Sequence, residues 1–224
     1  MRILLQVLLL FGLLIAVDIG RYFALPDIGA LREKNPEKTA YMRYREQQWR
    51  DRGVRKEVRN RWVPLSRISR SLQRAVLVSE DRKFWEHEGF DYEAIEEAVQ
   101  KNVRKKAFAF GASTITQQLA RNLYLSPSKS PVRKLKEAIL TWRIERALPK
   151  ERILELYLNV AEWGDGIFGI EEAARHYYRK SASRLSAREA ARLAAVLPNP
   201  IRFSPTRPSR YIERRADRIY RMAK

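Results

Sequence analysis

The sequence predicts a mainly α-helical protein, and three observations lead to that prediction. Apolar residues recur every three or four positions over residues 65–79 and 95–103, which is the spacing of one helix face. Helix-start signals stand at Ser130, which precedes a proline, and at Ser186, which has Glu189 three positions later. No segment alternates apolar and polar residues convincingly as a half-buried strand does.

The composition limits the kinds of site the protein can hold. The chain of 224 residues suffices for one domain and an extension, and its 45% apolar residues can bury a core. Without cysteine, disulfides, thiol nucleophiles and zinc–thiolate sites are excluded, and His87 and His176 are too few for a histidine metal cluster.

The charge predicts an anionic partner. The chain has 45 basic and 26 acidic residues, a net charge of +19, which suits nucleic acid, anionic lipid or a phosphorylated substrate. The excess is spread along the chain and is densest after residue 201. A basic surface that merely aids solubility explains the same numbers.

The N-terminus predicts a membrane anchor. Residues 3–19 are apolar at all but three positions, which is close to the minimum length of a membrane-crossing helix. A cleaved signal peptide is the competing interpretation, but no convincing Ala-x-Ala pattern follows the apolar run. Residues 1–20 are therefore expected to stay as an anchor. Arg2 alone precedes this segment and four basic residues soon follow it, which by short-loop counting would leave the rest of the chain in the cytoplasm.

After the anchor, the chain divides into three predicted parts. Residues 21–61 are polar and poorly periodic, which indicates a stalk with some helix. The domain proper is expected over residues 62–206, and residues 207–224 are expected to form a basic C-terminal helix.

Glu80 is the first candidate for chemistry. It lies at the rim of the apolar stripe of the helix predicted over residues 65–79. Partial desolvation there would raise the carboxyl pKa towards the range of a general base. A solvated helix end is the alternative.

Glu137 is the second candidate. The helix that starts at Pro131 has its apolar residues at Leu135, Ala138, Ile139 and Trp142. Glu137 is expected opposite that face, directed into solvent or into a cleft. By spacing alone it is an ordinary surface charge with basic neighbours.

Residues 111–118 are the third candidate. This small, hydroxyl-rich stretch opens a helix, where free N–H groups and the positive helix end favour phosphate. Helix capping alone would also explain a hydroxyl here, whereas two consecutive glutamines have no evident core-packing role. The preceding residues 101–110 mix basic and aromatic side chains, which suits a membrane surface.

Taken in order, these segments resemble the monofunctional biosynthetic peptidoglycan transglycosylases, which polymerise the lipid-linked disaccharide precursor. The resemblance covers about residues 62–206 and consists of five motifs. They are Glu80–Asp91, Gly111–Gln118, Arg133-Lys134 with Glu137, Lys150–Asn159 and Ala190–Pro198. The sequence departs from the family pattern at Ala112, Arg121 and Lys129, where glycine, lysine and arginine are usual.

The resemblance implies a lysozyme-like fold with a small membrane-associated lobe, anchored in the inner membrane and facing the periplasm. This overrides the charge count on orientation. Glu80 would be the general base that activates the acceptor sugar, with inversion at the donor carbon. Glu137 would be the second catalytic residue, positioning donor groups or a divalent ion such as Mg²⁺ or Mn²⁺; no organic cofactor is expected. The implied substrate-binding residues are Asp81, Phe84, His87, Ser113, Thr114, Gln117, Gln118, Arg121, Lys129, Arg133 and Lys134.

The implied partners are lipid II, the growing lipid-linked glycan chain and the membrane, with cell-wall synthesis or division proteins as candidates and no nucleic acid. Two alternatives stay open. A glycan-cleaving enzyme on the same scaffold would use Glu80 as a general acid. A basic, membrane-anchored binding protein would be indifferent to Glu80 and sensitive to salt.

Overall fold

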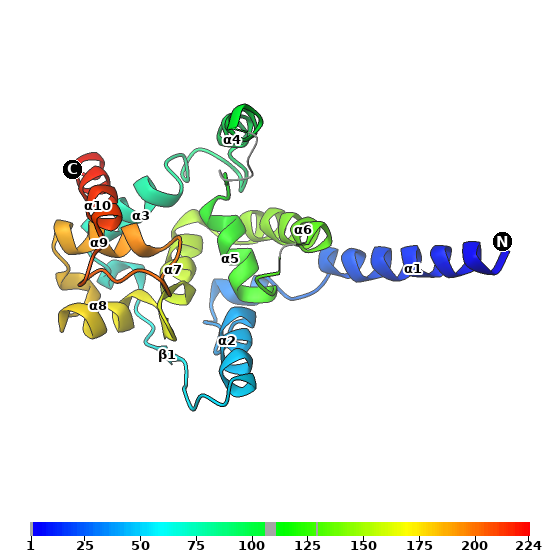
Figure 1. Ribbon diagram of the computed structural model, residues 1–224, viewed down its shortest axis with the longest axis horizontal. Helices are drawn as coiled ribbons and strands as arrows, with labels where there is room; N and C mark the ends of the chain where they lie inside the picture. Colours follow the sequence, from blue (N-terminus) through cyan, green and yellow to red (C-terminus); the bar gives the residue numbers. More distant parts are fainter. Residues whose placement is uncertain (1, 106–110, 129) are drawn as a thin grey trace.

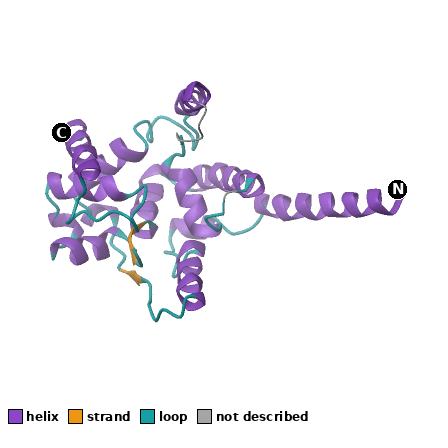
Figure 2. Cartoon of the chain, viewed as in Figure 1, coloured by secondary structure: helices purple, strands orange, loops and turns teal. Residues whose placement is uncertain are grey.

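The computed structural model describes residues 2–105, 111–128 and 130–224, and helices dominate these residues (Figure 1 and Figure 2). The α-helices in the described residues are α1 (Arg2–Gly20), α2 (Ala40–Asp51), α3 (Arg70–Glu80), α4 (Tyr92–Lys105), α5 (Ile115–Tyr124), α6 (Pro131–Ala147), α7 (Lys150–Val160), α8 (Ile170–Tyr178), α9 (Ala187–Val196) and α10 (Arg210–Met222). Short 3-10 helices cover Arg21–Phe23, Gly29–Arg32, Leu65–Arg67 and Ala182–Arg184. The predicted mainly α class is confirmed.

A small sheet is the part of the fold that the sequence pattern did not indicate. Strands β1 (Arg59–Asn60), β2 (Glu162–Gly164) and β3 (Ile167–Phe168) form it in the order β1-β3-β2. Strand β3 pairs parallel with β1 and antiparallel with β2. With two or three residues each, these strands are too short to show an alternating pattern.

The core is formed by helices from both halves of the chain. Helix α5 packs against α2, α6 and α7, while α9 packs against α3 and α10. The capping box predicted at Ser186 and Glu189 is present at the start of α9. Ser130 precedes α6 with Pro131 in its first turn, although the serine side chain makes no capping hydrogen bond. Glu80 is the last residue of α3, so the α3–α9–α10 packing positions the first candidate residue.

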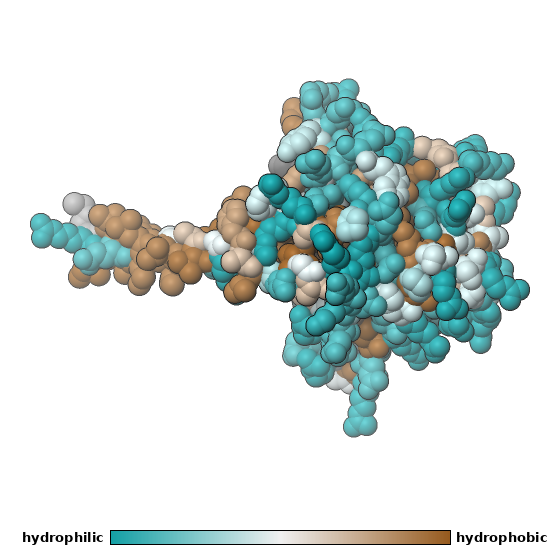
Figure 3. All heavy atoms as spheres, turned by 180° about the vertical axis from the view of Figure 1, so that it is seen from behind, coloured by the Kyte–Doolittle hydropathy of each residue, from teal (hydrophilic) through white to brown (hydrophobic). Residues whose placement is uncertain are grey.

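Helix α1 projects from the domain as a long apolar rod (Figure 1, Figure 3). It is long and apolar enough to cross a membrane, and no residue of it is buried. Its C-terminal end is tied to α6, because Lys136 forms an ion pair with Asp18. Arg143 of α6 donates hydrogen bonds to the carbonyl oxygens of Tyr22 and Ala24 at 3.0 and 2.9 Å. Helix α1 and the residues that follow it are therefore attached directly to the helix that holds Glu137.

The segment expected to be a stalk, residues 21–61, contributes buried side chains to the domain. Ile28, Leu31, Met42 and Trp49 are all less than a tenth exposed. Met42 and Trp49 lie seven positions apart, which places them on one face of α2. Two apolar residues in an otherwise charged helix are too few to show this periodicity in the sequence.

Helix α6 presents the opposite face to the core from the one expected. Leu135 is 56% exposed and Trp142 44% exposed. The buried side chains of the helix are Glu137, Leu140, Thr141 and Ile144. Of the apolar residues on which the expectation depended, Leu135 and Trp142 are exposed and Ala138 and Ile139 are only partly buried; Trp142 contacts Phe23. The expectation that Glu137 points away from the core is therefore wrong.

Candidate active site

The carboxylate of Glu80 is held by three donors at the end of α3. Its Oε1 accepts hydrogen bonds from Ser79 Oγ at 2.9 Å and from Arg215 Nη2 at 3.3 Å. Its Oε2 accepts a hydrogen bond from Gln118 Nε2 at 3.1 Å. The side chain is only 10% exposed, as its rim position predicted. The three donors fix the position of the carboxylate at the end of α3.

Gln118 is oriented towards Glu80 by a buried tyrosine. Tyr157, 1% exposed, donates a hydrogen bond from its hydroxyl to Gln118 Oε1 at 3.0 Å. Burial, reinforced by the negative charge of Glu80, raises the pKa of Tyr157 well above its usual range. Because the hydroxyl stays protonated, it fixes the amide oxygen of Gln118 on its own side and leaves the amide nitrogen facing Glu80.

Asp81 joins the first motif to the second. Its carboxylate accepts a hydrogen bond from the backbone N–H of Ile115, the first residue of α5, at 2.9 Å. The same carboxylate contacts His87 Nε2 at 2.9 Å, and His87 Nδ1 accepts from the N–H of Gly89 at 3.0 Å. Asp81 thus fixes the start of α5 beside the end of α3, and it acts here as a positioning residue.

Thr114 and Gln117 form the N-terminal cap of α5. Thr114 Oγ1 accepts from the N–H of Gln117, whose Oε1 accepts from the N–H of Thr114 at 3.0 Å. The Thr114 hydroxyl also donates to the carbonyl oxygen of Gly89 at 2.8 Å. The two consecutive glutamines therefore differ in role, since Gln117 caps the helix and Gln118 contacts Glu80. Gln117 is also buried, so the interpretation that neither glutamine packs into the core is wrong for Gln117.

Glu137 is the centre of a charge cluster on α6. It is 1% exposed, and its two oxygens form ion pairs with Arg133 and Lys134. Arg133 Nε also donates to the carbonyl oxygen of Ser128 at 2.5 Å. Lys134, half exposed, reaches Ser113 Oγ at 3.5 Å. The third motif thus borders the second, and its two cations are held by one buried carboxylate.

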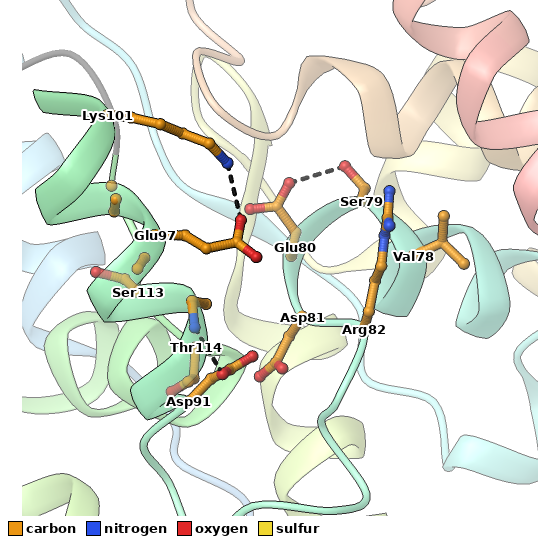
Figure 4. Close-up of a pocket in the computed structure, with 14 residues that line it drawn as sticks. Val78, Ser79, Glu80, Asp81, Arg82, Asp91, Glu97, Lys101, Ser113 and Thr114 are labelled. Carbon is orange, nitrogen blue, oxygen red and sulfur yellow. Dashed lines mark hydrogen bonds and ion pairs between the residues drawn. The ribbon is translucent and has the colours of Figure 1, made fainter. Parts of the chain in front are cut away.

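A cleft of about 320 Å³ connects these features. Figure 4 shows the carboxylate of Glu80 directed into it from α3, and Glu97 and Lys101 entering from α4. Glu97 and Lys101 form an ion pair at 2.8 Å. Ser113 lines the same cleft and is the residue that Lys134 contacts. Glu80 and the cation cluster are therefore linked through Ser113.

The remaining predicted site residues do not all line this cleft. Phe84 is fully buried in the core, with Lys150 Nζ lying 4.6 Å from the centre of its ring, so it is not available to a substrate. His87 is nearly as buried and holds Asp81. Arg121 is partly buried and has no hydrogen bond or ion pair among the described residues. Lys129, like residues 106–110 of the basic-aromatic segment, lies outside the described residues.

Arg215 is a functional candidate that the sequence patterns did not single out. It comes from α10, and its Nη2 contacts both Ser79 Oγ, at 2.9 Å, and Glu80 Oε1. Its Nε is buried without a hydrogen-bond partner in the described residues. Arg215 is one of eight basic residues between Arg202 and Lys224. Only the packing of α10 against α3 and α9 distinguishes it from its neighbours.

The match with known proteins covers most of this structure. The family model described as "Transglycosylase" matches residues 46–224. The chain belongs to the transglycosylase family. The matched range includes the second half of α2 and all of α10 as well as the candidate site, so the transglycosylase match extends beyond the expected domain of residues 62–206 at both ends.

Similar proteins carry one shared name. The chain is 47% identical over 221 residues to a biosynthetic peptidoglycan transglycosylase of Herminiimonas arsenicoxydans, covering 99% of this chain and 95% of that protein. It is 53% identical over 169 residues to the protein of that name in Aromatoleum aromaticum, covering 75% and 74% of the two chains. The protein of that name in Laribacter hongkongensis is 50% identical over 187 residues.

Proposed function

We propose that this protein polymerises the glycan strands of peptidoglycan from lipid II by inverting glycosyl transfer and releases undecaprenyl diphosphate. The observation that carries the proposal is the link between Glu80 and the Arg133–Lys134–Glu137 cluster through Ser113. Glu80 in the cleft offers a proton acceptor, and the cluster that contacts Ser113 at the edge of the cleft offers positive charge. Transfer from a sugar diphosphate needs both.

Glu80 takes the role of the general base. As the 4-hydroxyl oxygen of the acceptor N-acetylglucosamine attacks C1 of the donor, the hydroxyl proton passes to the Glu80 carboxylate. A new C–O bond forms, and the bond to the diphosphate breaks with its electron pair. Because this is a single displacement, the configuration at C1 inverts. Gln118 and Arg215 hold the carboxylate in place while it accepts the proton.

Positive side chains stabilise the leaving diphosphate. The diphosphate departs as an anion, so preorganised cations aid its departure more than an acid would. Arg133 and Lys134 are fixed by Glu137, and Arg121 has no competing partner among the described residues. Glu137 thus positions the two cations by pairing with both.

The residues around Glu137 do not fit a divalent metal ion. Both of its oxygens are engaged by cations, and the described residues contain no group of three acidic or histidine side chains that could hold a metal. A Mg²⁺ or Mn²⁺ site needs several oxygen donors. The cations of Arg133 and Lys134 occupy the place where a metal would have to bind.

We further propose that α1 anchors the protein in the inner membrane with the domain in the periplasm, where lipid II is consumed. In support, α1 is long and apolar enough to cross a membrane, and no residue of it is buried. Apolar side chains continue onto the domain at the foot of α1, where Phe23, Leu25, Leu135 and Trp142 are all exposed. Exposed apolar and aromatic side chains at this position suit the interfacial region of a bilayer. Partners among cell-wall synthesis or division proteins belong to the same proposal.

The test uses the detergent-solubilised protein and its Glu80→Gln variant. Each is incubated with purified lipid II and, separately, with finished glycan strands, and product size is followed. The wild type is expected to convert lipid II into polymer, and the variant to fold and bind lipid II without turnover. If strands shorten while lipid II stays unused, the enzyme is hydrolytic. If neither substrate changes, the protein belongs to the binding class.

A further inference from the structure

Helix α10 has a row of arginines on its outer side. Arg210, Arg214, Arg218 and Arg221, called here the arginine stripe, are all exposed. At about 100° per residue they fall within an arc of roughly 80°. The opposite face buries Ile212, Ala216 and Ile219 against the domain. The stripe is thus a row of positive charge on a firmly packed helix, and the exposed acidic residues Glu213 and Asp217 border it on one side.

The four arginines of the stripe are free of protein partners. None of them forms a hydrogen bond, ion pair or ring contact with any residue that the structure describes. Like charges four positions apart destabilise a helix. Glu213 and Asp217 form no ion pair with these arginines in the described residues, so the repulsion is not relieved within the helix and the stripe does not serve its stability. A partner that supplies negative charge would relieve the repulsion.

The position of α10 indicates which kind of anion can reach the stripe. Figure 1 shows α10 at the end of the molecule away from the free end of α1. A bilayer that contains α1 therefore lies on the other side of the domain, so lipid headgroups of that bilayer are not the natural partner.

Helix α10 itself lies close to the cleft. Arg82, which lines the cleft, contacts Met222 Sδ of α10 at 3.4 Å. Arg215 of the same helix contacts Glu80. A polymer that leaves the cleft on this side passes over α10.

We propose that the arginine stripe binds the carboxylates on the peptide side chains of glycan strands and holds the strand against the pole of the domain opposite the membrane. This inference rests on the proposed function, because it takes the polymer to be peptidoglycan. The free carboxylates of successive peptide side chains form a row of anions. Four arginines in one row match that chemistry, since guanidinium groups bind carboxylates through paired hydrogen bonds.

The test measures co-sedimentation of the full-length, detergent-solubilised protein with purified, insoluble peptidoglycan sacculi. The triple variant R210Q/R214Q/R218Q is compared with R52Q/R55Q/R59Q, which removes three exposed arginines from the segment around β1. The stripe variant is expected to bind sacculi roughly tenfold more weakly, because several individually weak charge pairs act together. The control variant is expected to bind like the wild type. When the carboxylates of the sacculi have been amidated, the wild type and the stripe variant are expected to bind them equally.

Two further measurements decide the remaining outcomes. The stripe variant is expected to unfold at or above the unfolding temperature of the wild type, because repulsion between the arginines is relieved. If the stripe variant unfolds at a lower temperature, and the stripe and control variants lose the same amount of sacculus binding, the proposal is overturned. Equal binding of wild type and stripe variant, or stripe-dependent binding to anionic vesicles instead of sacculi, would also overturn it. Polymerisation of lipid II is assayed on the same preparations. If the wild type polymerises lipid II but the wild type and the stripe variant bind sacculi equally, only this inference is refuted. If the wild type does not polymerise lipid II, the proposed function is refuted.

Discussion

The guanidinium of Arg215, close to the end of the chain, lies 3.3 Å from the carboxylate of Glu80. The two residues are 135 positions apart in the sequence. Helix α10 therefore takes part in the candidate site and is more than a basic extension of the domain.

Arg215→Met is expected to lower kcat by roughly ten- to a hundredfold with little change in KM, because a misplaced general base reduces turnover more than binding. Arg215→Lys should restore part of the loss, since it keeps the positive charge. Both values come from initial rates of lipid II polymerisation. Arg70→Met is the control, because Arg70 is an exposed arginine at the start of α3, the helix that ends at Glu80. A loss of the same size in the control would refute a specific role for Arg215.

Gln118→Glu is expected to lower kcat by about a hundredfold, because it exchanges a donor to Glu80 for a like charge. Gln117→Glu is the matched control, since glutamate is equally suited to the third position of a capping box. That variant should keep both its activity and its unfolding temperature. Equal losses in the two variants would contradict the different roles that the structure gives these glutamines.

Tyr157→Phe is expected to reduce kcat by about tenfold or less, because the lost hydrogen bond orients Gln118 and does not touch Glu80 directly. Combining it with Gln118→Glu should add little to the loss caused by Gln118→Glu alone, since both changes act on the same contact. The four rates of this double-mutant cycle provide the measurement. Fully additive losses would show that Tyr157 acts independently of Gln118.

Glu137→Gln is expected to lower activity strongly, because Arg133 and Lys134 lose the carboxylate that holds them. Arg133→Ala should weaken use of the donor more than use of the acceptor, which single-turnover assays with the two substrates varied separately can show. Added chelator is expected to leave the wild-type rate unchanged, since the site lacks the oxygen donors of a divalent ion. A rate abolished by chelator and restored by Mg²⁺ would contradict that assignment.

Stability is expected to fall as the pH rises above about 10, the ordinary pKa of tyrosine. Burial raises the pKa of both Tyr124 and Tyr178 to about 12. Between these values the unfolded chain loses phenol protons that the folded chain keeps, so the free energy of unfolding decreases with pH. Each tyrosine contributes at most about 1.4 kcal/mol per pH unit. Urea unfolding of the wild type and of Y124F/Y178F between pH 10 and 12 measures this decrease. If the free energy of unfolding falls with pH as steeply in the variant as in the wild type, the prediction is refuted.

The sequence alone was sufficient for the helical class, the apolar N-terminal helix and several local signals. The capping box at Ser186 depends only on residues three positions apart, and the apolar run of α1 depends only on its own composition. Local spacing controls such features, so they can be predicted without knowing what packs against them. The pairing of Arg133 and Lys134 with Glu137 is of the same kind, since it lies within one turn of α6.

Tertiary structure decided which side of α6 is buried and what Glu80 contacts. The apolar residues of α6 predicted the wrong buried face because an apolar side chain beside a membrane anchor need not point into the core. Gln118, Tyr157 and Arg215 surround Glu80 from three helices that are far apart in the chain. The sequence by itself determined the helices, the apolar character of α1 and the identity of the charged residues. Only the packing of α3, α5, α7 and α10 brought these side chains together, because hydrogen bonds between distant segments depend on the three-dimensional arrangement and leave no periodic pattern in the sequence.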